Sequence, residues 1–192
     1  MIYILDLETN GLVLNDVSVT QVAYLKLDPY LNIEEEDNRY FYTNNLKRSA
    51  DITGLTPTRL ANLSGGQELT PEILSELMKE IEHGIIIGQN IYYDLMVLDA
   101  LTMRNGMHVI PKYPLDISAQ YSPEDSIMNL EWIVNNHMDS EGAKILENRF
   151  KGQDSQYHDA LYDIYSVYAV IKNDPDFKER LRNYLKTVPR KE

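Results

Sequence analysis

The sequence contains no cysteine, so disulfide bonds and thiolate metal sites are excluded. No segment approaches the roughly 18 unbroken apolar residues of a membrane span. The N-terminus has no basic stretch followed by a long apolar run, which disfavours a signal peptide. We therefore expect a cytoplasmic protein without a membrane association.

Positive charge is also scarce in this chain. It has 18 Lys and Arg against 30 Asp and Glu, which makes a formal net charge of -12. An acidic surface repels phosphate backbones, so tight non-specific binding to nucleic acid is disfavoured. An enzyme that holds phosphates through bound cations stays compatible with this charge, because the cations offset site carboxylates locally.

The 192 residues, of which 43% are hydrophobic, suit one domain with a substantial core. No internal repeat, low-complexity segment or linker divides the chain, so we expect a single α/β domain over residues 1–192. Residues 178–192 hold six basic and two acidic side chains and form a short, mildly basic C-terminal tail.

Apolar and β-branched runs between turn residues predict the strands. We expect strands at residues 2–7, 19–27, 39–43, 85–87 and near 109–117. A polar turn containing Glu34, Glu35 and Glu36 is expected before the third strand, and short connections predict an antiparallel meander of the first three. The isoleucine run at 85–87 indicates a buried, central strand.

Capping patterns predict where several helices begin and end. The Thr-Pro pairs at 56–57 and 70–71 each suit an N-cap followed by proline at the first helical position. Gly84 is expected to end the second of these helices, and Asn90 to cap the next one. Further helices are expected around residues 129–136 and over residues 159–171.

Two carboxylates occupy the first predicted strand. Residues two apart in a strand point to the same face, so Asp6 and Glu8 project together, in line with Ile2 and Ile4. The alternative is that the strand ends at Leu5 and that both acids are solvated.

Two further acids interrupt apolar helical faces. Asp94 falls in one stripe with Leu98 and Leu101, whereas Asp99 lies off that stripe and is expected at the surface. Asp163 borders a second stripe, which is formed by Ala160, Ile164, Val167, Tyr168 and Ile171. A single acid of this kind is often a cap or the partner of a buried Arg.

Divalent cations explain the four acids better than ion pairs do. Buried carboxylates are normally paired or bound to metal, and no Lys or Arg occurs in residues 1–25 or between Lys79 and Arg104. Hard oxygen ligands without cysteine or clustered histidine suit Mg²⁺ or Mn²⁺. We therefore expect Asp6, Glu8, Asp94 and Asp163 to bind two divalent cations.

His158 supplies a candidate proton acceptor. It stands five residues before Asp163, about 140° around a helix, so the two do not share a helical face. We expect His158 at or just before the helix start, positioned over the site as a general base. The other histidines, at positions 83, 108 and 137, are expected to be structural.

Three motifs in this order resemble the DEDDh exonucleases, the family of the proofreading epsilon subunit of bacterial DNA polymerase III. "DLETNGL" is similar to the first motif, "GQNIYYDLMVL" to the second and "HDALYDIYSVYAVI" to the third. "ADITGLTPTRLA" is similar to the segment between the first two. The resemblance spans about residues 2–171. It implies a ribonuclease H-like fold, in which helices flank a mixed five-stranded sheet.

The resemblance also implies 3′→5′ removal of nucleotides from a nucleic-acid end by a two-metal mechanism. Glu8 would bridge the two cations and His158 would be the general base. Thr9, Asn10, Gly11 and Leu12 would cradle the terminal nucleotide, with Asn90 also binding substrate. Tyr93 is expected to pack in the core, with base stacking by Tyr92 or Tyr93 as the alternative.

Two positions depart from the family. Asn10 stands where a second Thr is common and is expected to alter how the terminal nucleotide is held, and Gln89 stands where His is common. Only about twenty residues follow the third motif, which disfavours a dedicated replicase subunit with a tail that tethers it to its polymerase partner.

Three functions remain open on the sequence. The preferred one is a nuclease that shortens DNA from a single-stranded or frayed 3′ end and releases nucleoside 5′-monophosphates, in proofreading or repair. The alternatives are an oligoribonuclease-like enzyme acting on short RNA and a non-catalytic nucleic-acid-binding scaffold. The acidic charge predicts weak, distributive binding of a few terminal nucleotides.

Overall fold

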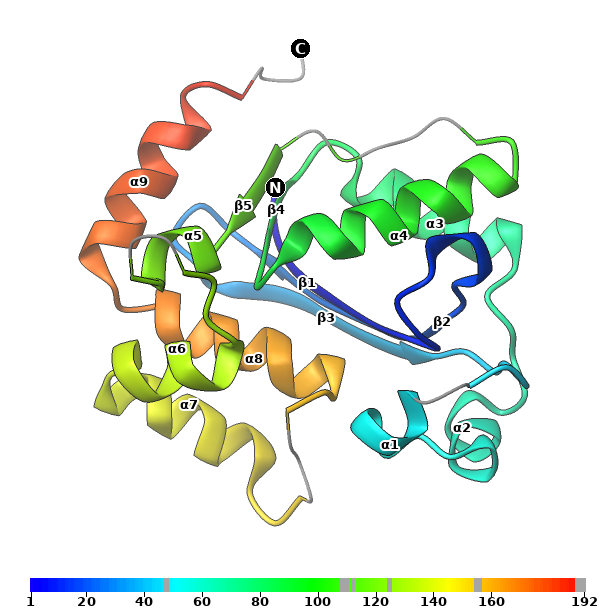
Figure 1. The fold of residues 1–192 in the computed structure, drawn as a ribbon. Helices are drawn as coiled ribbons and strands as arrows, with labels where there is room; N and C mark the ends of the chain where they lie inside the picture. Colours follow the sequence, from blue (N-terminus) through cyan, green and yellow to red (C-terminus); the bar gives the residue numbers. More distant parts are fainter. Residues whose placement is uncertain (47–48, 108–110, 112, 124–125, 154–156, 189–192) are drawn as a thin grey trace.

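A computed structural model describes residues 1–46, 49–107, 111, 113–123, 126–153 and 157–188. Five strands form one mixed sheet in the order β3-β2-β1-β4-β5 (Figure 1). The strands are β1 (Ile2–Thr9), β2 (Val19–Leu27), β3 (Ile33–Tyr40), β4 (Ile85–Gly88) and β5 (Tyr113–Asp116). Pairs β1–β2 and β2–β3 are antiparallel, whereas β1–β4 and β4–β5 are parallel. The predicted α/β class, with its initial meander, is confirmed.

Helices cover both faces of this sheet (Figure 1). They are η1 (Leu14–Asp16), α1 (Ser49–Thr53), α2 (Pro57–Ser64), α3 (Pro71–Ile81), α4 (Ile91–Arg104), α5 (Ser118–Tyr121), α6 (Leu130–His137), α7 (Ser140–Phe150), α8 (Ala160–Ile171) and α9 (Pro175–Leu185). Thr56 and Thr70 cap α2 and α3 as predicted. No helix within the described ranges is long and apolar enough to cross a membrane.

The alternation of β1 assigns its side chains to two separate cores. Ile2 and Ile4 pack in a cluster with residues of α6, α7, α8 and α9. Tyr3, Leu5 and Leu7 pack on the opposite face with residues of α3 and α4. Asp6 and Glu8 continue the register of Ile2 and Ile4, so they project toward the α8 side.

The predicted turn before the third strand is wrong. The acids Glu34, Glu35 and Glu36 belong to strand β3 and not to a turn before it. An edge strand tolerates them because its outer side is solvated and cations lie nearby: Lys26 pairs with Glu35 at 3.6 Å and Arg149 with Glu36 at 2.7 Å.

The C-terminal tail contains most of a helix that was not predicted from the sequence. Residues 175–185 form α9, which buries Phe177 and Leu181 in the same core as α8. These two apolar residues are four positions apart, which is a helical spacing. The prediction for this segment rested only on its charges and did not use that spacing. Of the predicted strand near 109–117, residues 109, 110 and 112 lie outside the described residues, as does His108.

Gly84 was expected to end α3, but the helix ends at Ile81 with Glu82 as its C-cap residue, and the φ of Gly84 is not positive. The position requires glycine for a different reason. A Cβ atom there would overlap the ring of Tyr3. That ring is buried, and its hydroxyl donates to Glu80 Oε1 at 2.8 Å, so it has little freedom to move.

Gly84→Ala is therefore expected to destabilise the fold by about 1–3 kcal/mol, the usual cost of overpacking a core. The measurement is urea unfolding. Tyr3→Leu supplies the control, because removing the ring should make a subsequent Gly84→Ala change nearly neutral. A full Gly84→Ala penalty in the Tyr3→Leu background would contradict this explanation.

Candidate active site

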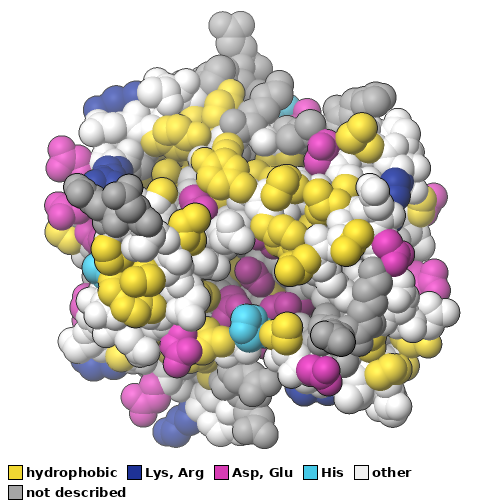
Figure 2. Space-filling view, viewed as in Figure 1, with side chains coloured by type: hydrophobic (Ala, Val, Ile, Leu, Met, Phe, Trp, Pro, Cys, Tyr) yellow, Lys and Arg dark blue, Asp and Glu magenta, His cyan; other side chains and the backbone are white. Residues whose placement is uncertain are grey.

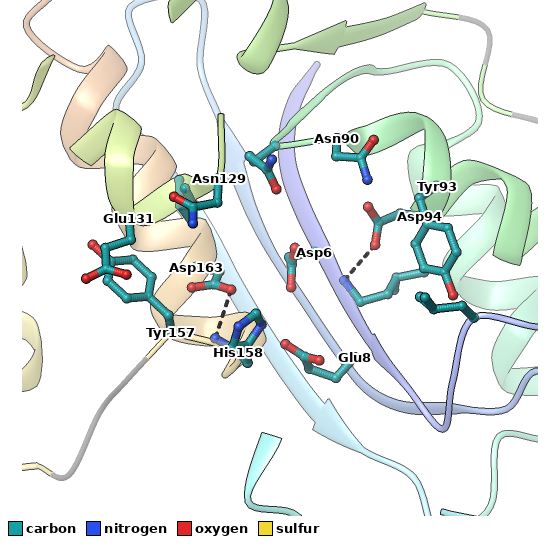
Figure 3. Close-up of a pocket in the computed structure, with 14 residues that line it drawn as sticks. Asp6, Glu8, Asn90, Tyr93, Asp94, Asn129, Glu131, Tyr157, His158 and Asp163 are labelled. Atoms are coloured by element: carbon teal, nitrogen blue, oxygen red, sulfur yellow. Dashed lines mark hydrogen bonds between the residues drawn. The ribbon is translucent and has the colours of Figure 1, made fainter. Parts of the chain in front are cut away.

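The four predicted acids and His158 meet in one cleft of about 340 Å³. Asp6 and Glu8 come from the second half of β1, Asp94 from the first turn of α4 and Asp163 from the first turn of α8. Their side chains point toward one another, with Asp6 between Asp94 and Asp163 (Figure 3). The cleft is further lined by Leu7, Leu12, Gln89, Asn90, Tyr93, Asn129, Leu130, Glu131 and Tyr157.

Strand β1 continues through both of its acids. The alternative in which the strand ends at Leu5 is wrong, because pairing with β2 extends through Glu8 to Thr9. The backbone N–H of Leu7 donates to Asp94 Oδ1 at 3.1 Å, which ties the buried carboxylate of α4 to this strand. The acids thus stand on rigid elements.

Asp163 and His158 lie on the other side of the cleft. The backbone N–H of His158 donates to Asp163 Oδ2 at 3.2 Å, and His158 directly precedes the N-cap residue of α8, as predicted. Asp163 Oδ1 is buried and has no hydrogen-bond partner among the described residues. One ligand atom each of Glu8, His158 and Asp163 lie within 4.8 Å of one another. This unsatisfied oxygen in an oxygen-rich cluster fits a hard divalent cation.

Burial is the main electrostatic influence on these carboxyl groups. Together with the nearby carboxylates, it raises the pKa of Asp6 to about 7 and that of Glu8 to about 10. Burial also raises the pKa of Asp94 and of Asp163 well above the ordinary value, and the charge of Asp6 adds to both shifts. In the part of the chain that the structure describes, no Lys or Arg forms an ion pair with any of the four.

The loop after β1 contributes Leu12 to the cleft, with 80% of the residue exposed. Asn10 is not among the described residues that line the cleft, so its predicted influence on the terminal nucleotide would act through the loop. Its side chain is fully buried: Oδ1 accepts from Ser18 N at 2.8 Å, and Nδ2 donates to the carbonyl of Asn45 at 2.8 Å. The amide shapes this loop from beneath.

Thr9 and Gly11 are also held within the loop. The Thr9 hydroxyl donates to the carbonyl of Gly11 at 3.1 Å, and the Tyr93 hydroxyl donates to the same oxygen at 3.1 Å. Tyr93 packs against the core that contains residues of α3 and α4, as predicted. It also lines the cleft. Tyr92 is 55% exposed and is not among the described lining residues.

Asn90 lines the cleft and is the N-cap residue of α4, as predicted, although its side chain makes no capping hydrogen bond. Its backbone is left-handed, with φ 53°. The N–H of Asn90 donates to Asp116 Oδ1 at 3.0 Å, so a carboxylate at the end of β5 holds this turn. Gln89, which stands where the family commonly has His, donates from Nε2 to the carbonyl of Met128 at 3.2 Å.

Sequence reasoning missed several residues around the site. Asp116 ends β5 beside the carboxyl end of β4, and Asp159 caps α8 next to His158. Asn129, Glu131 and Tyr157 line the cleft, although none carries a sequence signal strong enough to place it there. Two of the histidines that were expected to be structural lie outside the cleft. His83 Nε2 is 3.6 Å from Glu82 Oε1, and the ring of His137 packs against those of Tyr121 and Trp132.

Figure 2 shows the acids and a histidine in a hollow on one face of the molecule, with hydrophobic side chains gathered beside it over α4. The sequence profile of the exonuclease family (RNase T) matches residues 3–171, a range that includes the four acids and His158. The chain belongs to the exonuclease family. Among curated proteins, none matches its sequence significantly.

Solved structures of exonuclease I share the fold of this exonuclease family member. One such structure matches with a TM-score of 0.67 at 20% identity, over 97% of this chain and 43% of that one. E. coli exonuclease I bound to a dT13 oligonucleotide matches with a TM-score of 0.65 at 20% identity, with coverages of 97% of this chain and 43% of that one. The same enzyme with a dA16 oligonucleotide gives 0.64 at 20% identity, with coverages of 97% and 43%.

This chain therefore spans less than half the length of these exonuclease I chains. At 20% identity, the match establishes the ribonuclease H-like fold, with its mixed five-stranded sheet flanked by helices.

Proposed function

We propose that this protein is a metal-dependent 3′→5′ exonuclease that releases nucleoside 5′-monophosphates from nucleic acid, with DNA preferred. The observation that carries the proposal is the convergence of four carboxylates and a histidine in one cleft, with no cationic partner among the described residues. Membership of the exonuclease family and the oligonucleotide complexes of exonuclease I support it.

The carboxylates Asp6, Glu8, Asp94 and Asp163 would hold two divalent cations, Mg²⁺ or Mn²⁺. When bound, such a pair lowers the pKa of a coordinated water and stabilises the charge that develops on the attacking and leaving oxygens. The chain contributes rigid placement: β1, α4 and α8 fix the carboxylates before substrate arrives. Glu8, which lies near both His158 and Asp163, is the acid proposed to bridge the cations.

His158 is the proposed general base. Its imidazole, exposed at the mouth of the cleft, accepts the proton of the attacking water at a ring nitrogen. The water oxygen attacks the terminal phosphorus, and the bond to the leaving 3′-oxygen breaks. Exposed Leu12 offers an apolar contact to the terminal base, and Tyr93, whose hydroxyl donates to the carbonyl of Gly11, lines the same cleft.

The test is digestion of a single strand that is labelled at either end, with Mg²⁺ or Mn²⁺ present. We expect a ladder of shortened products from the 5′-labelled strand and mononucleotide as the first product from the 3′-labelled strand. Mononucleotide released first from the 5′ end would refute the polarity. Binding of metal and strand without cleavage would favour a scaffold of the same fold.

Substrate choice is measured in the same assay. Matched DNA and RNA strands, both single-stranded and with a mispaired 3′ end, should be digested at different rates, with DNA faster. Faster digestion of short RNA would favour the oligoribonuclease-like alternative. A polymerase partner and a role in proofreading or repair stay predictions that depend on this outcome.

A further inference from the structure

The backbone of His158 is held in an uncommon conformation. Its φ of 68° lies in the left-handed region, which costs free energy for a residue with a side chain. Such a conformation persists where neighbouring groups hold it. Asp163 provides one such group, because its Oδ2 accepts the His158 N–H at 3.2 Å.

Asp159 is anchored more extensively than an N-cap requires. Its Oδ1 accepts from the backbone N–H groups of Leu161 at 3.1 Å and Tyr162 at 3.4 Å, which is ordinary helix capping. The same oxygen accepts from Gln21 Nε2 at 3.2 Å, and Oδ2 accepts from the Tyr40 hydroxyl at 3.3 Å. Donors from β2, β3 and α8 therefore surround one carboxylate.

Gln21 completes the connection between the sheet and α8. It is buried on β2 directly opposite Glu8 of β1, and its Oε1 accepts from the Ala160 N–H at 3.1 Å. Its Nε2 also donates to Asn38 Oδ1 at 3.0 Å, which fixes the orientation of the amide. The start of α8 is thereby tied to the strand pair that carries Glu8.

We propose that Asp159 is a positioning residue that holds the His158 imidazole over the acidic cluster. This inference rests on the proposed function, in which His158 accepts the proton of the attacking water. Both Asp159 oxygens accept hydrogen bonds from the protein, and the described lining of the cleft includes His158 but not Asp159. Asp159 therefore acts through the neighbouring histidine and does not contact the substrate.

Asp159→Ala is expected to lower kcat by about 10- to 100-fold while KM changes less than about twofold, because displacing a catalytic group by about 1 Å costs this much. Asp159→Asn should restore most of kcat, since Asn caps helices equally well and retains an acceptor oxygen. Asp139→Ala is the matched control: Asp139 caps α7, where its Oδ1 accepts from Gly142 N at 2.6 Å. It should leave kcat unchanged.

The deciding measurement repeats Asp159→Ala in a His158→Ala background. If Asp159 acts through His158, the second substitution should change the rate less than about twofold. An equal fall in both backgrounds, or no fall in the wild-type background, would overturn the positioning role and leave the proposed function intact. An unchanged rate in His158→Ala alone would overturn the general base and the positioning role together.

A spectroscopic measurement separates positioning from a general loss of structure. The chain has four histidines, so the ring signals are few, and the His158 signal is identified by its loss in His158→Ala. In Asp159→Ala this NMR signal should shift or broaden, whereas Asp139→Ala should leave it unchanged. A His158 signal unaltered by Asp159→Ala would overturn the inference.

Discussion

Asp163→Asn is expected to lower the rate of nucleotide release by about 1000-fold or more. Bound cations supply several kcal/mol of transition-state stabilisation, and about 1.4 kcal/mol corresponds to a tenfold change in rate. Asn keeps an acceptor for the His158 N–H, so the backbone bond to position 163 can persist while the ligand charge is lost.

His158→Ala should lower kcat by about 100- to 10,000-fold, the range for a general base.

Matched control residues lie outside the cleft. Asp99→Asn neutralises a carboxylate on α4 that does not line the described cleft, and it should leave the rate within about twofold of wild type. His83→Ala serves the same purpose for the histidine, because His83 lies outside the cleft. If Asp163→Asn or His158→Ala digests as its control does, the role assigned to that residue is wrong.

Removal of divalent metal should abolish the nuclease activity and make the stability of the folded protein fall as pH rises. The pKa of Asp6 is raised to about 7 and that of Glu8 to about 10, so the folded state binds protons that the unfolded chain releases at lower pH. The stability associated with these protons is fully present below the unfolded pKa values. It is lost as pH rises through about 7 and then about 10.

Added Mg²⁺ or Mn²⁺ should reverse this loss, since bound cations favour the ionised ligands. At about 100 times Kd, a ligand stabilises by about 2.7 kcal/mol, which is roughly 5–10 °C in Tm for a chain of this size. The measurement is thermal unfolding with chelator and with metal at about pH 5.5 and about pH 8, where the metal effect should be larger at the higher pH.

Asp163→Asn tests the origin of this effect. The variant removes one buried ionisable group, so its metal-free form should be more stable than metal-free wild type at the higher pH and should gain less from metal. An equal gain in Tm from metal in the variant and in wild type would show that the cations bind elsewhere.

The secondary structure near the site was largely predictable because it depends on local patterns. The Thr-Pro signals placed the starts of α2 and α3, and period-two alternation placed Asp6 and Glu8 on one face of β1. The apolar stripe containing Asp94 correctly indicated a buried acid on α4. Strand β3 was misplaced because an acidic edge strand looks like a turn when its cationic partners are distant in sequence.

The roles of Asn10 and Asp159 depended on contacts that no local pattern contains. Asn10 was expected near the substrate because residues 9–12 belong to a motif that resembles the family's first one. In the structure its side-chain amide is hydrogen-bonded to the N–H of Ser18 and the carbonyl of Asn45. Asp159 lay at the start of a predicted helix and was given no role, and its bond to Gln21 joins residues 138 positions apart. Side-chain direction in loops follows packing, which sequence spacing does not specify.

The sequence by itself determined which groups are available to the site: four carboxylates and a histidine, all within the region that matches the exonuclease family. These are properties of residue type and periodicity. Only the tertiary structure decided that β1, α4 and α8 bring the ligands into one cleft, and that the β2–α8 connection holds His158 at its mouth. The physical reason is that burial and hydrogen bonding between distant segments arise when the sheet and its two helical layers pack together.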